Sequence, residues 1–192
     1  MNTLTGEEKI WEAFKKGDPQ AFKALYDHYV NALYAYGMML CHDNDKVQDC
    51  IHDLFIALWD SRHSFSIPVS GKAYLMVSLR RRVFDKGPKL DSLTDGLDHL
   101  DENTLKETDH EARWILKEST EENNAQLQDA FNKLSDRQRE IIHMKYFQEL
   151  DYDEIGRIMG LNYQSARNLV TRALAALRKE MLLLVMILLM FT

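Results

Sequence analysis

The chain has 192 residues, 45% of them hydrophobic, so it can bury one large core or two small ones. It has only three prolines and eight glycines, and apolar and polar residues never alternate for long, which favours an all-α fold. A formal net charge of −6 argues against tight binding to nucleic acid by the chain alone. Two cysteines give no disulfide framework and no signal peptide is recognisable, so we expect a cytoplasmic protein.

Four helices are expected within residues 1–90, which we interpret as a first small domain. The first runs from about Glu7 to Phe14, and Asp18-Pro19 opens the second with a cap and a first-turn proline. Asp43 opens the third, and the fourth spans about 72–86. Each has apolar residues at helical spacing, so these helices can share one core.

One face of the third predicted helix combines acidic and apolar side chains. Its residues are Asp49, His52, Asp53, Ile56 and Trp59. Apolar residues ringed by carboxylates can form a docking surface for a partner. Alternatively, another helix of the same domain covers the apolar members, and the pattern alone fits both interpretations.

Two further clusters in this domain contain residues of chemical interest. Arg80, Arg81 and Arg82 are plausible phosphate contacts, although a solvated basic cluster would have the same sequence. The cysteines Cys41 and Cys50 have histidines nearby, but their spacing fits no usual zinc-ligand pattern. We therefore expect no metal and no cofactor.

An acidic segment follows the first domain. Residues 87–125 contain 11 acidic and 4 basic side chains, whereas the flanking parts are nearly balanced. We interpret residues 91–122 as an acidic linker, because most of this stretch lacks sustained periodicity. Helical spacing returns over residues 110–134, at the approach to the second domain.

The second domain, residues 123–180, contains the spacing of a helix-turn-helix. Ser135 and Gln138 form a capping box that opens one helix. Residues 153–159 form the next, in which Gly156 permits a close helix approach. Gly160 supplies a left-handed turn, and Asn162 is placed to cap the last helix.

The last predicted helix has one apolar and one polar face. The polar face contains Gln164, Ser165, Arg167, Asn168, Thr171 and Arg172. It offers bidentate hydrogen-bonding groups and cations but no carboxylate, which is the composition needed to read base edges and contact phosphates. A solvated face of an ordinary helical hairpin is the alternative, so the motif needs its structural context.

The chain ends in a hydrophobic tail, residues 181–192. Met181 to Phe191 are eleven apolar residues in succession. As a helix this run is about 16 Å long, against roughly 30 Å of bilayer hydrocarbon, so we expect no integral membrane insertion. Either the tail packs on the protein's own first domain or another chain buries it.

Four segments resemble the sigma-70 family of bacterial RNA polymerase initiation factors, and most closely its small extracytoplasmic-function type. DPQAFKALYDHYVNALYAYG is similar to the start of sigma domain 2, and VQDCIHDLFIALW to the part that docks on polymerase. AYLMVSLRRRVFDK resembles the segment that opens and reads the minus-ten element. LSDRQREIIHMKYFQELDYDEIGRIMGLNYQSARNLVTRALAALR resembles domain 4, whose last helix reads the minus-thirty-five element.

The resemblance implies a role for each cluster. The acidic and apolar face of the third helix would dock on core RNA polymerase. Capture of the minus-ten element would fall to Phe65, Tyr74, Arg80, Arg81, Arg82 and Lys86. The polar face of the last helix would read the minus-thirty-five element. The implied partners are core RNA polymerase, promoter DNA and an anti-sigma factor, and the implied mechanism has no covalent step.

Two other classes of protein remain open on the sequence. The first is a one-component transcription regulator that binds operator DNA as a dimer and uses residues 1–90 for ligand binding or dimerisation. The second is an interaction module that uses the hydrophobic tail, which leaves the polar face of the last helix unexplained. We do not expect an enzyme, because the sequence offers no nucleophile–base pair and no phosphate-binding glycine loop.

Overall fold

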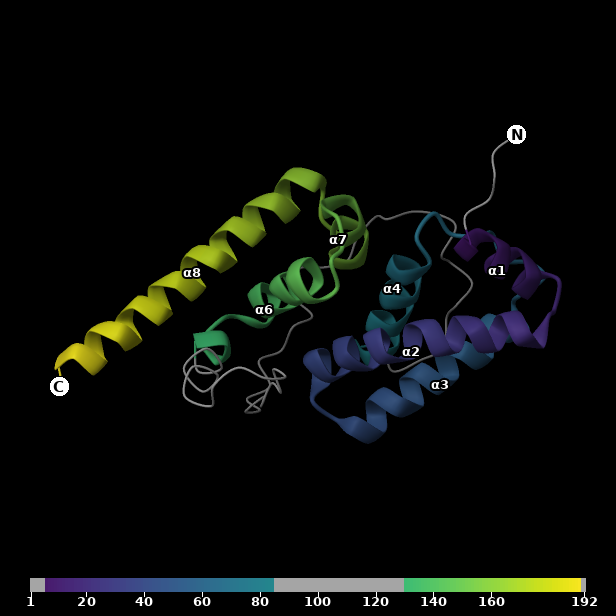
Figure 1. The fold of residues 1–192 in the computed structure, drawn as a ribbon, viewed down its shortest axis with the longest axis horizontal. Coiled ribbons are helices and arrows are strands. Elements are labelled where there is room, and N and C mark those ends of the chain that lie inside the picture. Colours follow the sequence, from purple (N-terminus) through teal and green to yellow (C-terminus); the bar gives the residue numbers. More distant parts are fainter. Residues whose placement is uncertain (1–5, 85–129, 191–192) are drawn as a thin grey trace. The chain divides into compact units, whose positions relative to one another are not determined.

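The computed structural model describes residues 6–84 and 130–190, with the backbone alone for residues 182–190. Every regular element within these ranges is helical. The chain divides into two compact units, Met1–Leu97 (unit 1) and Asp98–Thr192 (unit 2). The all-α prediction is therefore confirmed (Figure 1). The predicted linker, residues 91–122, and most of the helix expected over 110–134 lie outside the described residues.

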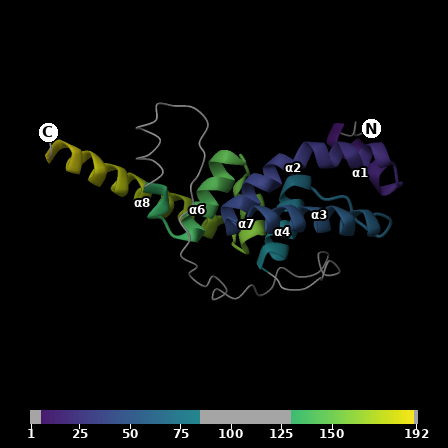
Figure 2. The same cartoon turned by 90° about the horizontal axis from the view of Figure 1, so that it is seen from below.

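Unit 1 is built around its longest helix. Its elements are α1 (Gly6–Lys15), α2 (Pro19–Cys41), α3 (Asn44–Asp60) and α4 (Gly71–Phe84). Helix α2 contacts the other three, and it runs beside α3 in both views (Figures 1 and 2). The core contains fully buried side chains from all four helices, among them Trp11, Leu33, Leu54 and Met76. Burial of these faces against one another supplies the main stabilisation of the unit.

Local signals in the sequence set where these helices begin and end. The Asp18 carboxylate accepts a hydrogen bond from the Gln20 backbone at 2.8 Å and caps α2. His42 ends α2 in a left-handed conformation, and Asp43 then caps α3 through the Lys46 backbone N–H. The predicted caps at Asp18 and Asp43 are thus confirmed.

Unit 2 is described from Ala130 onward. Its elements are α6 (Asp136–Ile142), the π-helical turn η1 (His143–Phe147), α7 (Tyr152–Met159) and α8 (Tyr163–Met190). Helix α8 contacts α6 and α7, so one long helix supports the other elements. The capping box that joins Ser135 and Gln138 is present as predicted, and a second one joins Asp151 and Glu154.

The π-helical turn η1 is a feature that the sequence did not predict. The Gln148 N–H donates to the His143 carbonyl at 3.0 Å, five residues back, which widens the helix. The Gln148 side chain reaches back to the His143 ring, with 3.1 Å between the two Nε2 atoms, and both residues are buried. The wider turn brings both side chains to the core side, a consequence of packing that periodicity does not indicate.

The backbone of α8 continues past the boundary drawn at residue 180. The helix has 28 residues and ends at Met190, so the apolar tail begins as an extension of the same helix rather than after a break. In both views its C-terminal part extends beyond α6 (Figures 1 and 2). Among the described residues, no helix meets the length and hydrophobicity needed to cross a membrane.

Candidate DNA-binding and polymerase-docking surfaces

Helices α7 and α8 form a helix-turn-helix whose geometry depends on two glycines. A Cβ atom on Gly156 would lie 2.5 Å from the Leu161 carbonyl oxygen, so only glycine fits where the turn crosses α7. Gly160 has φ +65° and ends α7 in the left-handed region, which glycine enters without strain. The Asn162 side chain accepts a hydrogen bond from the Ser165 N–H at 2.8 Å and caps α8.

The two faces of α8 divide between core and solvent as its periodicity predicts. Ala166, Val170 and Ala173 are buried at 0%, 3% and 0% exposure, against α6 and α7. Five members of the polar face are exposed and the sixth is half-buried: Gln164, Arg167, Asn168, Thr171 and Arg172, then Ser165. The turn therefore fixes a polar helix face at the surface of unit 2.

Contacts along this face hold part of it in place before any ligand binds. The Gln164 Nε2 donates to the Asn168 Oδ1 at 3.1 Å, and the Thr171 hydroxyl donates to the Arg167 carbonyl at 3.1 Å. Residues 163–179 include three arginines and one lysine but no acidic residue. This surface is therefore locally positive on a chain whose net charge is negative, which suits phosphate contacts.

Two residues beside this face were not singled out from the sequence. Tyr163, the first residue of α8, is 50% exposed, and its ring centroid lies 5.5 Å from that of Tyr152. The Lys145 ammonium lies 4.7 Å from the Tyr152 ring centroid and donates to the Leu150 carbonyl at 3.0 Å. The available signal was an aromatic residue directly after the cap of α8.

On unit 1, the acidic and apolar face of α3 is mostly exposed. Asp49, His52 and Asp53 are exposed, and Ile56 is 53% exposed. Trp59 is different, because its ring lies 5.0 Å from Phe22 and 6.2 Å from Phe14, measured between ring centroids. Helices α1 and α2 therefore cover part of Trp59. For this residue, the alternative that other helices of the same domain cover the apolar side chain is correct.

The Trp59 ring also takes part in a cation–π interaction. The Arg62 guanidinium lies 4.4 Å from the ring centroid and donates a hydrogen bond to the Trp59 carbonyl at 2.7 Å. This arrangement fixes the end of α3 and the start of the loop that follows it.

Four of the residues expected to capture the minus-ten element lie on α4. Arg80, Arg81 and Arg82 are half-buried near the end of α4, and the Arg80 guanidinium lies 5.3 Å from the Phe84 ring centroid. Tyr74 is half-buried as well, and burial raises the pKa of its hydroxyl. Lys86 lies outside the described residues.

Phe65 requires a correction. The resemblance implied that its ring helps to capture the minus-ten element, but the structure leaves the side chain only 9% exposed. Its ring lies against Trp11, Phe14 and Tyr74, with centroid distances of 5.4, 6.3 and 5.2 Å. Phe65 is thus part of the aromatic core, because α1 supplies a nonlocal partner that the loop sequence does not reveal.

The cysteines are free thiols and partly buried. Burial raises the pKa of Cys50, which keeps its thiol protonated and unreactive. Within the part of the chain that the structure describes, no group of three or more histidine, cysteine, aspartate or glutamate residues is arranged to hold a metal ion.

Comparison with known proteins identifies both units. A family model described as sigma-70 region 2 matches residues 25–86, and one described as sigma-70 region 4 matches residues 124–177. Together they match more than half of the chain. The SigW extracytoplasmic-function sigma factor of Bacillus subtilis is 26% identical over 173 residues, covering 87% of this chain and 92% of the relative. SigX of the same organism is 24% identical over 166 residues, covering 86% of each.

Solved structures share the fold. CnrH, solved in complex with the cytosolic domain of CnrY, has a TM-score of 0.63 at 17% identity, covering 91% of this chain and 96% of that one. The sigma factor RpoE of Bartonella quintana, solved with the anti-sigma factor NepR, has a TM-score of 0.59 at 23% identity. That match covers 83% of this chain and 95% of the other.

Proposed function

Because this chain belongs to the sigma-70 family, in its extracytoplasmic-function type, we propose that it starts transcription by a division of labour between its units. Unit 1 docks on core RNA polymerase and captures the opened minus-ten element. Unit 2 reads the duplex of the minus-thirty-five element through α8. The process is one of binding and DNA opening without a covalent step, and it takes place in the cytoplasm.

The observation that supports this best is the exposed polar face of α8. Gln164 and Asn168 offer amide groups for adenine edges, and Arg167 offers a guanidinium for guanine edges. Ser165, Thr171 and Arg172 flank them and suit phosphate contacts, to which we add the half-exposed Tyr163. A helix N-terminus inserted into a major groove would bring these groups to the bases together.

The charge distribution supports a need for polymerase. The face of α8 is positive, but the whole chain has a net charge of −6. Protein–DNA affinity depends strongly on the number of phosphates neutralised, so four basic residues on one helix give weak binding at physiological salt. Core polymerase would supply the missing positive field and hold the two units at a fixed separation.

On unit 1, we assign polymerase docking to the exposed side of α3. Ile56 is the most exposed apolar residue of this surface, and the exposed Asp49, His52 and Asp53 lie on the two preceding turns of the same helix. Trp59 contributes only the part of its ring that α1 and α2 leave uncovered. A central apolar side chain in a ring of polar ones is the usual arrangement of an interface hot spot.

Replacing Ile56 with arginine tests this docking surface. The side chain is 53% exposed, so the change should leave the free energy of unfolding almost unaltered. Loss of a central apolar anchor should weaken the affinity for core polymerase by about tenfold to a hundredfold. Asn31→Arg, at an exposed position of α2, is the matched control. Equal affinity losses in both variants, measured by competition with a labelled sigma factor, would place docking elsewhere.

Capture of the opened minus-ten element is assigned to α4. Arg80, Arg81 and Arg82 provide cations for the backbone of the separated strand, and Lys86 follows them in the sequence. Tyr74 provides an aromatic edge at the start of the same helix. Phe65 is left out of this set because its ring is buried in the core of unit 1.

An anti-sigma factor would complete the regulation. Such a partner would have to cover the α3 docking surface or the α8 face to prevent transcription. The alternative from the sequence, a one-component regulator that binds operator DNA as a dimer without polymerase, is not favoured by the sigma-70 matches of both units. The experiment that tests the proposal is co-purification with core polymerase followed by run-off transcription from a promoter library. Transcripts that start at one shared sequence class support it, and polymerase that stays inactive with this chain bound contradicts it.

A further inference from the structure

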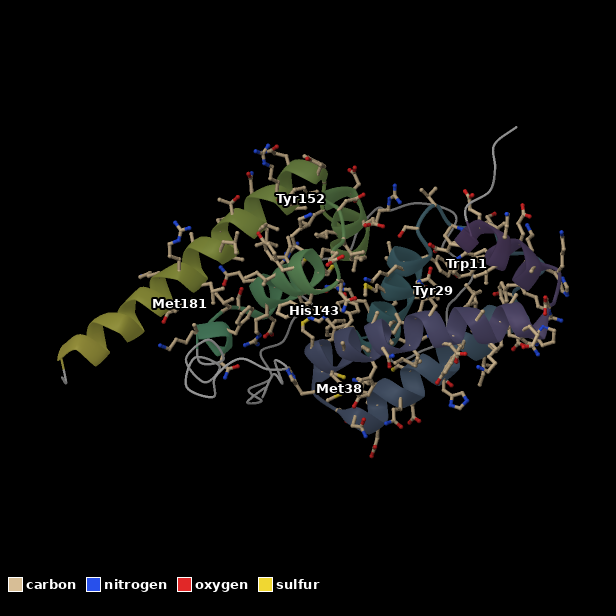
Figure 3. The ribbon with its side chains drawn as sticks, viewed as in Figure 1. Trp11, Tyr29, Met38, His143, Tyr152 and Met181 are labelled. Carbon is tan, nitrogen blue, oxygen red and sulfur yellow. The ribbon has the colours of Figure 1, made fainter. Side chains whose placement is uncertain are left out.

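Helix α1 lies outside residues 25–86, the part of unit 1 that matches the family model, yet it is packed into the core. Trp11 is 1% exposed and Phe14 is fully buried. Figure 3 shows Trp11 from α1 and Tyr29 from α2 lying close together, and 6.4 Å separates their ring centroids. The helix is therefore an integral part of unit 1, and its inner face points at the beginning of α4.

Three side chains from α1 and α2 form a hydrogen-bonded group, which we call the α1 clamp: Glu7, Trp11 and Tyr29. The Glu7 carboxylate accepts a short hydrogen bond from the Tyr29 hydroxyl and a longer one, 3.4 Å, from the Trp11 Nε1. Burial and the nearby Glu7 carboxylate raise the pKa of Tyr29 far above its ordinary value. The hydroxyl thus remains a donor at any physiological pH.

The first residue of α4 lies directly against this clamp. A Cβ atom on Gly71 would come within 2.6 Å of the Tyr29 hydroxyl oxygen, 2.7 Å of the Trp11 Nε1 and 2.8 Å of the Glu7 Oε1. Any side chain at this position would force the clamp side chains to shift. The negative Glu7 carboxylate also lies at the N-terminal, positive end of the helix, where it is stabilising.

The loop before α4 packs against α1. Phe65 stacks on Trp11 at 5.4 Å and meets Phe14 edge-on at 6.3 Å. The Ser70 hydroxyl then caps α4 by accepting the Ala73 N–H at 3.2 Å. Between these anchors Val69 is 94% exposed. Residues 65–70 are therefore held at both ends, while Val69 between these anchors is open to solvent.

We propose that the α1 clamp is a positioning device for promoter opening, which fixes the start of α4 and the tip of the preceding loop against the separated strand. This rests on the function proposed above for α4. Glu7, Trp11 and Tyr29 are positioning residues and do not touch DNA. Strand capture needs fixed geometry, because contacts to unpaired bases must offset the cost of unstacking them.

A purely structural role for α1 makes a different prediction. If the clamp only stabilised unit 1, its loss would weaken polymerase docking and act equally on every template. If it positions α4 for opening, a variant should fail on closed duplex but recover on a template already opened by mismatches. On such a template the unstacking cost has been removed, so weaker capture suffices.

Two variants with matched controls separate these cases. Tyr29→Phe removes one hydroxyl, and Tyr26→Phe removes another from an exposed position of the same helix. Gly71→Ala crowds the clamp, whereas Gly6→Ala adds a methyl group at the first residue of α1, with nothing within 4 Å. Glu7→Gln, which keeps an acceptor, should be milder than Glu7→Ala.

The measurement is open-complex formation by holoenzyme assembled from core polymerase and each full-length variant. On closed promoter duplex, Tyr29→Phe and Gly71→Ala should reduce it by about tenfold, the effect of losing a hydrogen bond to a charged acceptor. On the mismatched template both should approach wild type, with polymerase affinity unchanged and both controls normal. Equal deficits on the two templates, lost polymerase affinity, or no deficit on duplex would each overturn the proposal.

Arg81→Ala in the same assay distinguishes a failure of the clamp from a failure of the function assigned to α4. If Arg81→Ala lowers opening and the clamp variants do not, α4 captures DNA without help from α1. If Arg81→Ala has no effect on either template, the assignment of DNA capture to α4 is wrong. The clamp then has no role in promoter opening.

Discussion

Replacing Arg167 with alanine is expected to reduce transcription that depends on the upstream promoter element by about tenfold to a hundredfold, the range for losing one bidentate base contact. Arg167 is exposed in the middle of the polar face, and its backbone carbonyl accepts the Thr171 hydroxyl at 3.1 Å. The side chain makes no contribution to the buried face of α8, so stability and polymerase binding should not change. Run-off transcription from promoters with intact and scrambled upstream elements measures the effect.

The matched control is Arg157→Ala, which removes the same charge from an exposed position of α7. A change of charge alone should weaken DNA binding slightly and on every sequence. Arg167→Ala should instead remove the difference between intact and scrambled elements. The assigned face is wrong if Arg167→Ala lowers polymerase affinity as much as promoter recognition, or if both variants lose the same element-specific activity.

Replacing Gly156 with alanine is expected to lower the free energy of unfolding of unit 2 by about 1–3 kcal/mol, the range for overpacking a tight contact. The added Cβ would lie 2.5 Å from the Leu161 carbonyl oxygen. That oxygen belongs to the backbone of the turn, and the Leu161 N–H donates to the Gly156 carbonyl at 2.8 Å. Relief therefore requires the turn itself to move, which misplaces α8 relative to α7.

Hydrogen exchange of the α7 and α8 amides in the full-length chain measures this effect by unit. Protection should fall in unit 2 and remain in unit 1, with upstream-element recognition lost and polymerase docking retained. Gly6→Ala is the control, because a methyl group there meets nothing within 4 Å. Unchanged protection in Gly156→Ala would mean that the two helices do not cross as closely as the structure shows.

Much of this architecture follows from local sequence chemistry. Asp18-Pro19, Ser135 with Gln138, and Asn162 each satisfy backbone N–H groups within three residues, so their sequence spacing is enough to predict a helix start. Gly160 likewise enters the left-handed region because of its own lack of a side chain. The exposed face of α8 was predictable for a similar reason, since burial follows helical periodicity once the helix ends are known.

The features that sequence reasoning missed depend on contacts between distant residues. The burial of Phe65 depends on Trp11, which lies 54 positions away along the chain, so no local sequence pattern predicts it. For Trp59 the sequence left both interpretations open, and only the distant partners Phe14 and Phe22 show that its ring is partly covered. The π-helical turn depends on the packing of His143 and Gln148, and no propensity scale indicates it.

We propose that α8 reads duplex DNA only when polymerase holds this chain against the promoter. Fluorescence anisotropy of a labelled promoter duplex, titrated with this protein in the presence and absence of core polymerase, tests it most directly. We expect sequence-specific binding with polymerase and weak, sequence-independent binding without it. Tight binding of a dimer to one specific duplex in the absence of polymerase would contradict it.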